Sequence, residues 1–342
     1  MGKYLKLFDT HTEYLAFTQT SDFVKPNVSH CITENHVHYN PWTWADDYLT
    51  FVAKGSGTFT FTPQNSNVIS YSTDGGETWT QGNSVAVNSG DKVMWKGTMT
   101  PASSQGVGKF GSTAEFDVQG NAMSLLFGDN FKGQTDLTGK DYAFYGLFNG
   151  NTKVVSAENL SLPATTLAQS CYRNMFINCT SFVTAPKLPA TTLPEKCYQY
   201  MFRNCTSLTT APELPATTLT DGCYYGMFYD CTSFVTAPAL PATTLTSNCY
   251  NAMFNGCTSL TTAPVLPATT LASNCYTNMF NGCTSLNYIK AMFTTTPGTT
   301  NTNNWVNGVA ANGTFVKNSA AQWDVSGIHG VPSGWTIEIA SE

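Results

Sequence analysis

The stretch from Leu162 to Pro186 reads LPATTLAQSCYRNMFINCTSFVTAP, and four close copies follow it, beginning at Leu188, Leu214, Leu240 and Leu266. Each copy starts 26 residues after the one before. A fixed period of this length indicates a repeat architecture, in which every unit forms one coil of a solenoid. One unit cannot bury its apolar residues alone, so the coils must stack to form a common core.

The copies place ten of the eleven cysteines in two series with the same step of 26. We predict that both series form ladders through the solenoid core, Cys171, Cys197, Cys223, Cys249 and Cys275 in the first and Cys179, Cys205, Cys231, Cys257 and Cys283 in the second. Buried thiols behave as small apolar groups. The sequence favours free thiols, while a disulfide within each unit stays open. Metal binding is disfavoured because seven residues separate the two cysteines and no histidine is near.

Within the first unit, Leu167, Cys171, Met175 and Cys179 recur at steps of four. This spacing predicts one face of a short helix or helical turn. Residues 181–186 then alternate apolar and polar side chains, which predicts a short strand that Pro186 ends.

We assign 131–293 to the solenoid, with five regular units at 163–292 and a degenerate first unit at 137–160, where Ala143 and Asn151 stand at the cysteine positions. Residues 294–342 are predicted to be a linker and a C-terminal capping segment. The linker is the Thr/Asn-rich run 294–304, and the cap contains three tryptophans, Trp305, Trp323 and Trp335.

The unit resembles the BspA-like leucine-rich repeat, whose core pattern is Ala-Phe-x-x-Cys-x-x-Leu. Met175, Phe176, Cys179 and Phe182 stand at those four positions. The tail from Gly308 to Ile337 also resembles the end of such proteins from Bacteroides and its phages, so the resemblance covers about 46–340. It implies surface attachment and binding without catalysis, and members without a signal peptide resemble virion proteins of Bacteroides phages, including crAss-like phages.

Residues 46–130 predict a β-sandwich domain, because short runs rich in β-branched and aromatic residues alternate with glycine turns. The segment 72–79, STDGGETW, is similar to the Asp-box of sialidase propellers. It occurs once and is a structural turn in that family, so it carries little weight for sialidase activity.

Residues 1–45 predict an N-terminal arm or anchor module that orders against a partner; a strand added to the β-domain is the open alternative. The candidate anchor residues are Phe8, Phe23, Pro26, His36, His38, Trp42 and Trp44. His30, Cys31, His36 and His38 form a weak metal candidate. Charged residues interrupt the first 17 residues, so we predict no signal peptide.

Only 11% of the residues are charged and the net charge is −6, against about 25% charged in a typical soluble domain. Nucleic acid is disfavoured as a partner because phosphate contacts need clustered Lys and Arg. No apolar run is long enough to predict membrane insertion. The chain carries no nucleophile, paired-carboxylate or phosphate-loop motif, so we predict neither enzymatic activity nor a cofactor.

A few positions vary from unit to unit while the scaffold stays constant. They form a candidate binding face, because Tyr and Arg are typical of binding hot spots and Asn supplies adaptable hydrogen bonds. Its residues are Arg173, Tyr200, Arg203, Tyr225, Tyr229, Asn251, Asn255, Asn278 and Asn281. The alternative is a solvated surface that is free to vary.

The sequence therefore predicts a β-rich mixed protein that combines an arm, a β-sandwich, a leucine-rich-repeat-type solenoid and a cap. The expected function is that of a phage head or tail fibre or a capsid-decorating protein, located in the virion. Its expected partners are other virion proteins, a host-surface glycan or protein receptor, and further copies of itself, with a trimer favoured. A bacterial cell-surface adhesin is the alternative, and a glycosidase with a repeat domain is the least favoured reading.

Overall fold

The computed structural model describes residues 47–341. This described part is β-rich with almost no helix, and its several sheets are open. The strands are β1 (Leu49–Ala53), β2 (Gly57–Pro63), β3 (Ile69–Ser72), β4 (Thr80–Gln81), β5 (Ser84–Val87), β6 (Lys92–Gly97), β7 (Gly108–Ser112), β8 (Phe116–Asn121), β9 (Val154–Ser161), β10 (Tyr288–Ala291), β11 (Thr314–Lys317) and β12 (Thr336–Ile339). Two short helices, α2 (Ser124–Phe127) and the 3-10 helix η2 (Gly128–Asn130), follow β8.

The N-terminal part is made of two sheets, ordered β4-β3-β6-β1-β8-β9 and β5-β2-β7. Their inner faces meet in an aromatic core, because Phe51 of β1 contacts Phe59 of β2 and Phe110 of β7 at ring-centroid distances of 5.4 and 4.7 Å. Trp95 of β6 packs against Phe110 at 5.2 Å. Side chains alternate between this core and the outer face, as period-2 strands require.

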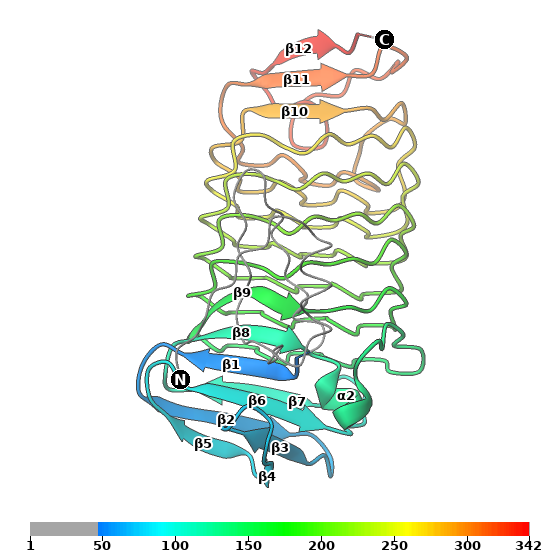
Figure 1. The fold of residues 1–342 in the computed structure, drawn as a ribbon. Helices are drawn as coiled ribbons and strands as arrows, with labels where there is room; N and C mark the ends of the chain where they lie inside the picture. Colours follow the sequence, from blue (N-terminus) through cyan, green and yellow to red (C-terminus); the bar gives the residue numbers. More distant parts are fainter. Residues whose placement is uncertain (1–46, 342) are drawn as a thin grey trace, which may run out of the picture.

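The 26-residue units form coils that stack one on the next above these sheets (Figure 1). A column of parallel bridges joins them, from Ser156 through Thr184, Thr210, Thr236 and Thr262 to Tyr288. At one end β9 pairs in parallel with β8, and at the other β10 pairs with β11 and β11 with β12. One backbone ladder therefore runs from the N-terminal sheet to the C-terminal strand.

The predicted helical face is wrong: the segment from Ala168 to Cys179 is a train of consecutive β-turns. Alternate N–H groups bond three residues back, such as Met175 to the Tyr172 carbonyl at 3.2 Å. The intervening groups bond to the next coil, such as Phe176 to the Met201 carbonyl at 2.9 Å. Every fourth residue has positive φ, so the train repeats every four residues and mimics the 3.6-residue helical period.

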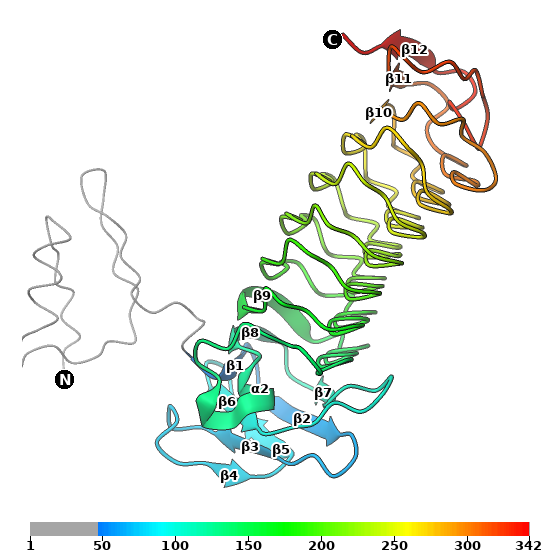
Figure 2. The ribbon, with the colours of Figure 1, turned by 90° about the vertical axis from the view of Figure 1, so that its right-hand side faces the viewer.

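We call these trains the turn face; it comprises 168–179, 194–205, 220–231, 246–257 and 272–283. Figure 2 shows it as the tightly wound side of the stack, with β9 and the equivalent segments of later coils on the other side.

Side chains behind the turn face form columns that run along the stack. Tyr172, Tyr198, Tyr224, Tyr250 and Tyr276 stack at ring-centroid distances of 5.7 to 6.0 Å. The phenylalanines of the Met-Phe pairs stack beside them at 5.7 to 5.8 Å, as in Phe202 on Phe228. These rings and both cysteine series belong to one hydrophobic core that also includes the N-terminal sheets.

All ten repeat cysteines are buried free thiols, the alternative that the sequence favoured. In the second series each thiol donates to the carbonyl of a phenylalanine in the preceding coil, such as Cys205 Sγ to Phe176 O at 3.1 Å. Asn151, which takes this position in the degenerate unit, donates through Nδ2 to the Phe110 carbonyl at 3.3 Å. An amide donor thus replaces the thiol donor there.

The stack extends beyond the five regular units at both ends. In the unit that begins at Leu137, Phe144 and Phe148 stack on Tyr172 and Phe176 at 5.5 and 5.1 Å. The run 294–304, predicted to be a linker, instead joins the stack, since the Asn301 carbonyl accepts from Tyr276 N–H at 3.0 Å.

Tryptophans then close the C-terminal end. Trp305 packs against Phe280 at 6.1 Å. The indole N–H groups of Trp305, Trp323 and Trp335 donate to the carbonyls of Gly330, Phe293 and Ala310. Each large ring therefore enters the core with its polar atom satisfied.

Candidate functional site

The turn face carries the variable positions in three rows. The first row holds Arg173, Gln199, Tyr225, Asn251 and Thr277, the second holds Asn174, Tyr200, Gly226, Ala252 and Asn278, and the third holds Ile177, Arg203, Tyr229, Asn255 and Asn281. The intervening cysteine, tyrosine, methionine and phenylalanine positions point into the core. The backbone therefore fixes the spacing of the three rows, and the side chains alone change along the stack.

Five of the nine predicted binding residues gather into one cluster. The Arg203 guanidinium lies over the rings of Tyr200 and Tyr229, 5.1 and 4.6 Å from their centroids. Tyr200 meets Tyr225 edge to face at 5.1 Å. We call Tyr145, Arg173, Tyr200, Arg203, Tyr225 and Tyr229 the Tyr/Arg cluster.

Tyr145 joins the cluster from the degenerate first unit and was not predicted from the sequence. Its ring lies 5.8 Å from the Arg173 guanidinium, and its hydroxyl accepts a hydrogen bond from Asn174 Nδ2 at 3.0 Å. The amino-acid composition offers a signal for the place of the site, because Arg173 and Arg203 are the two arginines of the whole chain. A tyrosine in a neighbouring unit could have been sought from there.

Tyr200 occupies an unfavourable backbone position. Its φ is 55°, and the equivalent residues of other coils are Asn174, Gly226, Ala252 and Asn278. A left-handed conformation costs a non-glycine residue on the order of 1 kcal/mol, with Asn penalised least. The turn train requires this conformation at every fourth residue, so Tyr200 stands where asparagine or glycine would fit with less strain.

The two arginines have few polar partners. No residue of 47–341 forms an ion pair within 4.0 Å of either guanidinium, and Nε of both is buried without a hydrogen bond. Arg203 does interact at longer range with Asp230, a carboxyl whose pKa is raised by burial and partly lowered by Arg203. Burial and the neighbouring Tyr225 raise the pKa of Tyr200, while both arginines lower it.

The four predicted asparagines lie in the later coils and make a different surface. Asn251 is buried and donates to Asn248 Oδ1 at 3.3 Å. Asn281 donates to Asn278 Oδ1 at 3.4 Å and accepts from Asn307 at 3.4 Å. Asn255 is half-buried. Three of these four side chains thus bond to other asparagines rather than to residues of the Tyr/Arg cluster.

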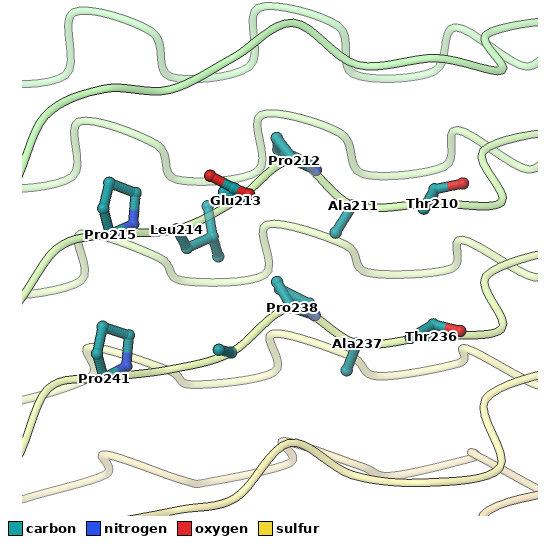
Figure 3. Close-up of a pocket in the computed structure, with 11 residues that line it drawn as sticks. Thr210, Ala211, Pro212, Glu213, Leu214, Pro215, Thr236, Ala237, Pro238 and Pro241 are labelled. Carbon is teal, nitrogen blue, oxygen red and sulfur yellow. The ribbon is translucent and has the colours of Figure 1, made fainter. Parts of the chain in front are cut away.

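A groove that the sequence analysis did not predict lies on the other side of the stack, between two successive coils (Figure 3). Its volume is about 380 Å³. Its walls are Thr210, Ala211, Pro212, Glu213, Leu214, Pro215, Thr236, Ala237, Pro238, Ala239 and Pro241. Glu213 is the single charged side chain of this lining, which is otherwise small and neutral.

The Asp-box segment forms the loop between β3 and β4. Asp74 accepts hydrogen bonds from Ser72 Oγ at 2.6 Å and from the Thr78 N–H at 3.0 Å, and these bonds hold the pKa of its carboxyl well below the usual value. Trp79 lies under the Lys96 ammonium at 4.1 Å. The motif thus organises a turn here, as it does in the family that it resembles.

The remaining predictions fall on residues that the structure does not describe. These are the anchor residues Phe8, Phe23, Pro26, His36, His38, Trp42 and Trp44, together with His30 and Cys31. Within 47–341, no group of three His, Cys, Asp or Glu side chains is placed to hold a metal ion. No helix of this part is long and apolar enough to cross a bilayer.

Comparison with known proteins adds no family: no family model, curated protein or solved structure matches the chain.

Proposed function

We propose that this chain is a non-enzymatic structural protein of a phage virion, a head or tail fibre or a capsid-decorating protein. It attaches through its N-terminal region and displays a leucine-rich-repeat-type solenoid that binds a host-surface glycan or receptor. The repeat's resemblance to BspA-like units and the stacked 26-residue coils with a parallel ladder support this assignment. A bacterial cell-surface adhesin of the same repeat class is the second candidate.

The Tyr/Arg cluster is the observation that carries the binding function. Five tyrosines and arginines from the variable positions lie together, whereas the side chains at the other variable positions are all neutral. Aromatic and arginine side chains fixed by mutual packing lose little entropy on binding, and they dominate the energetics of recognition surfaces.

The matched variant for this site is Tyr200→Asn, since Asn174 and Asn278 occupy the same position in other coils. It removes the ring while easing the backbone strain, so we expect thermal stability equal to or above that of the wild type. Binding of the full chain to a glycan array or to host cells should fall at least tenfold, as for a hot-spot residue. Unchanged binding would contradict the role of the cluster.

The location requires a separate measurement. Mass spectrometry of purified virions should detect the chain, and deletion of 1–45 should abolish its incorporation. Detection on protease-treated bacterial cells in the absence of phage would favour the adhesin. Light scattering of the full chain tests the trimer, which should have three times the 37.0 kDa chain mass.

A further inference from the structure

Both arginines of the chain are held next to one tyrosine. Arg203 lies over the ring of Tyr200, and the charges of Arg203 and Arg173 both act on the Tyr200 hydroxyl. Arg173 is in turn packed over Tyr145. Ring packing restricts both side chains, so their N–H groups are oriented before any ligand arrives.

Within 47–341, these guanidinium groups have no hydrogen-bond acceptor. Neither donates a hydrogen bond to a residue of 47–341, and each Nε is buried without a partner. Each side chain as a whole is half-buried, so a ligand would reach the terminal N–H groups of the guanidinium rather than the enclosed Nε. The planar fork of an arginine matches a carboxylate, which accepts two parallel hydrogen bonds from it.

We propose that the Tyr/Arg cluster binds a carboxylate-bearing sugar of a surface polysaccharide, an inference that rests on the binding function proposed above. The carboxylate takes the free N–H groups of Arg173 or Arg203, and the sugar ring packs its apolar face on Tyr200, Tyr225 or Tyr229.

Three features favour an acidic sugar over a more highly charged polymer or an acidic peptide. Asp230 interacts with Arg203 and would repel a ligand of high charge density. The cluster contains four half-buried tyrosines around its arginines, and their rings offer flat surfaces for sugar rings. The asparagine rows that follow in the next coils are neutral hydrogen-bonding groups, which suit the hydroxyls of the rest of a polysaccharide chain.

The test measures binding of the full chain to polygalacturonate and hyaluronate, each paired with its carboxyl-reduced neutral form. We expect the acidic forms to bind at least about tenfold more tightly, and this preference to shrink as salt rises. Arg203→Asn and Arg173→Gln place residues that other coils hold at these positions, as in Asn255 and Gln199. Each should reduce binding of the acidic form about tenfold or more without changing that of the neutral form.

Two controls separate charge from geometry. Arg203→Lys keeps the charge but loses the fork and the ring stacking, so we expect it to bind nearly as weakly as Arg203→Asn. Lys187→Gln removes an exposed charge outside the turn face and should leave binding unchanged. Thermal melting of every variant checks that the stack is intact.

Several outcomes would overturn the inference. Equal binding of acidic and neutral forms, or insensitivity to both arginine substitutions, would reject the carboxylate while leaving a Tyr200-dependent binding function in place. Failure of both acidic polymers to bind would also reject it. Equally tight, arginine-dependent binding of polyglutamate would reject the sugar component. If none of the cluster variants, including Tyr200→Asn, lost binding to host cells, the proposed function itself would be overturned.

Discussion

The repeat cysteines show how position decides the chemistry of a side chain. Every one is enclosed by the core, and burial raises the pKa of the Cys179 thiol from 9.0 to about 12. A thiol needs its thiolate form and access to solvent to react. The second series also donates hydrogen bonds to carbonyls of the preceding coil. These thiols are therefore structural donors rather than reactive groups.

We expect the ten repeat thiols to be unreactive toward a thiol reagent at pH 8 in the native protein and to react fully after unfolding in guanidinium chloride. More than one rapidly reacting thiol in the native chain would contradict this placement, since Cys31 is the single cysteine outside the described residues.

The same pKa shift predicts how stability depends on pH. The unfolded thiols lose their protons near pH 9, whereas the folded thiols keep theirs to about pH 12. Folding therefore becomes less favourable as pH rises from 9 toward 12, and below pH 9 this contribution is constant. Denaturation midpoints measured under reducing conditions at pH 8 and pH 10.5 should show a lower value at pH 10.5. An unchanged midpoint would contradict the predicted contribution of the buried thiols to stability.

The turn face is the element on which the candidate site depends. Its backbone requires a positive φ at every fourth residue, and Gly226 and Gly282 both meet this requirement, with φ of 57° and 76°. Their surroundings differ. A Cβ at Gly226 would lie 2.3 Å from Tyr200 Cε1, whereas at Gly282 the nearest atom would be 3.6 Å away. Tyr200 thus covers the glycine of the next coil.

Gly226→Ala and Gly282→Ala form a matched pair. Both should lose about 1 kcal/mol of unfolding free energy from the left-handed backbone. Gly226→Ala should lose a further 1–3 kcal/mol through overpacking and should also weaken glycan binding, because Tyr200 must move. Chemical denaturation and the binding assay measure the two effects. Equal losses for both variants would show that Tyr200 does not pack on Gly226.

At the scale of the whole molecule, the stack has two closed ends and a repetitive middle. The β8–β9 pairing joins it to the N-terminal sheets, and the coil around Trp305 covers the rings of Tyr276 and Phe280. Interior coils contact only their neighbours, so each is replaceable, whereas the ends shield a core that continues along the full length.

Two deletions, one of an interior coil and one of the C-terminal end, test this difference between interior coils and ends. Removal of 215–240 takes out one complete 26-residue period and rejoins Leu214 to Pro241 in register, so we expect a soluble, cooperatively melting protein. Removal of 294–342 exposes the rings of Tyr276 and Phe280 and the N–H groups that bond to 301–307. We expect aggregation or a large fall in melting temperature. The reverse ranking would refute the end-capping role.

The sequence by itself determined the 26-residue period, the two buried cysteine columns, the β-rich character of 46–130 and the residue types of the variable positions. Each of these is repeated or local, so a single chain reveals it. The tertiary structure alone decided three others. The turn trains replaced the predicted helix because a four-residue turn period is nearly helical in spacing. The coil at 294–308 could not be recognised from the sequence, because its side-chain pattern differs from that of the repeats. Backbone hydrogen bonds, which do not depend on that pattern, continue the stack there. The Tyr/Arg cluster forms because stacking brings Tyr145, Arg173, Tyr200 and Tyr229 of successive coils together. Which side chains meet depends on how each coil is positioned on the next, and the sequence does not reveal that.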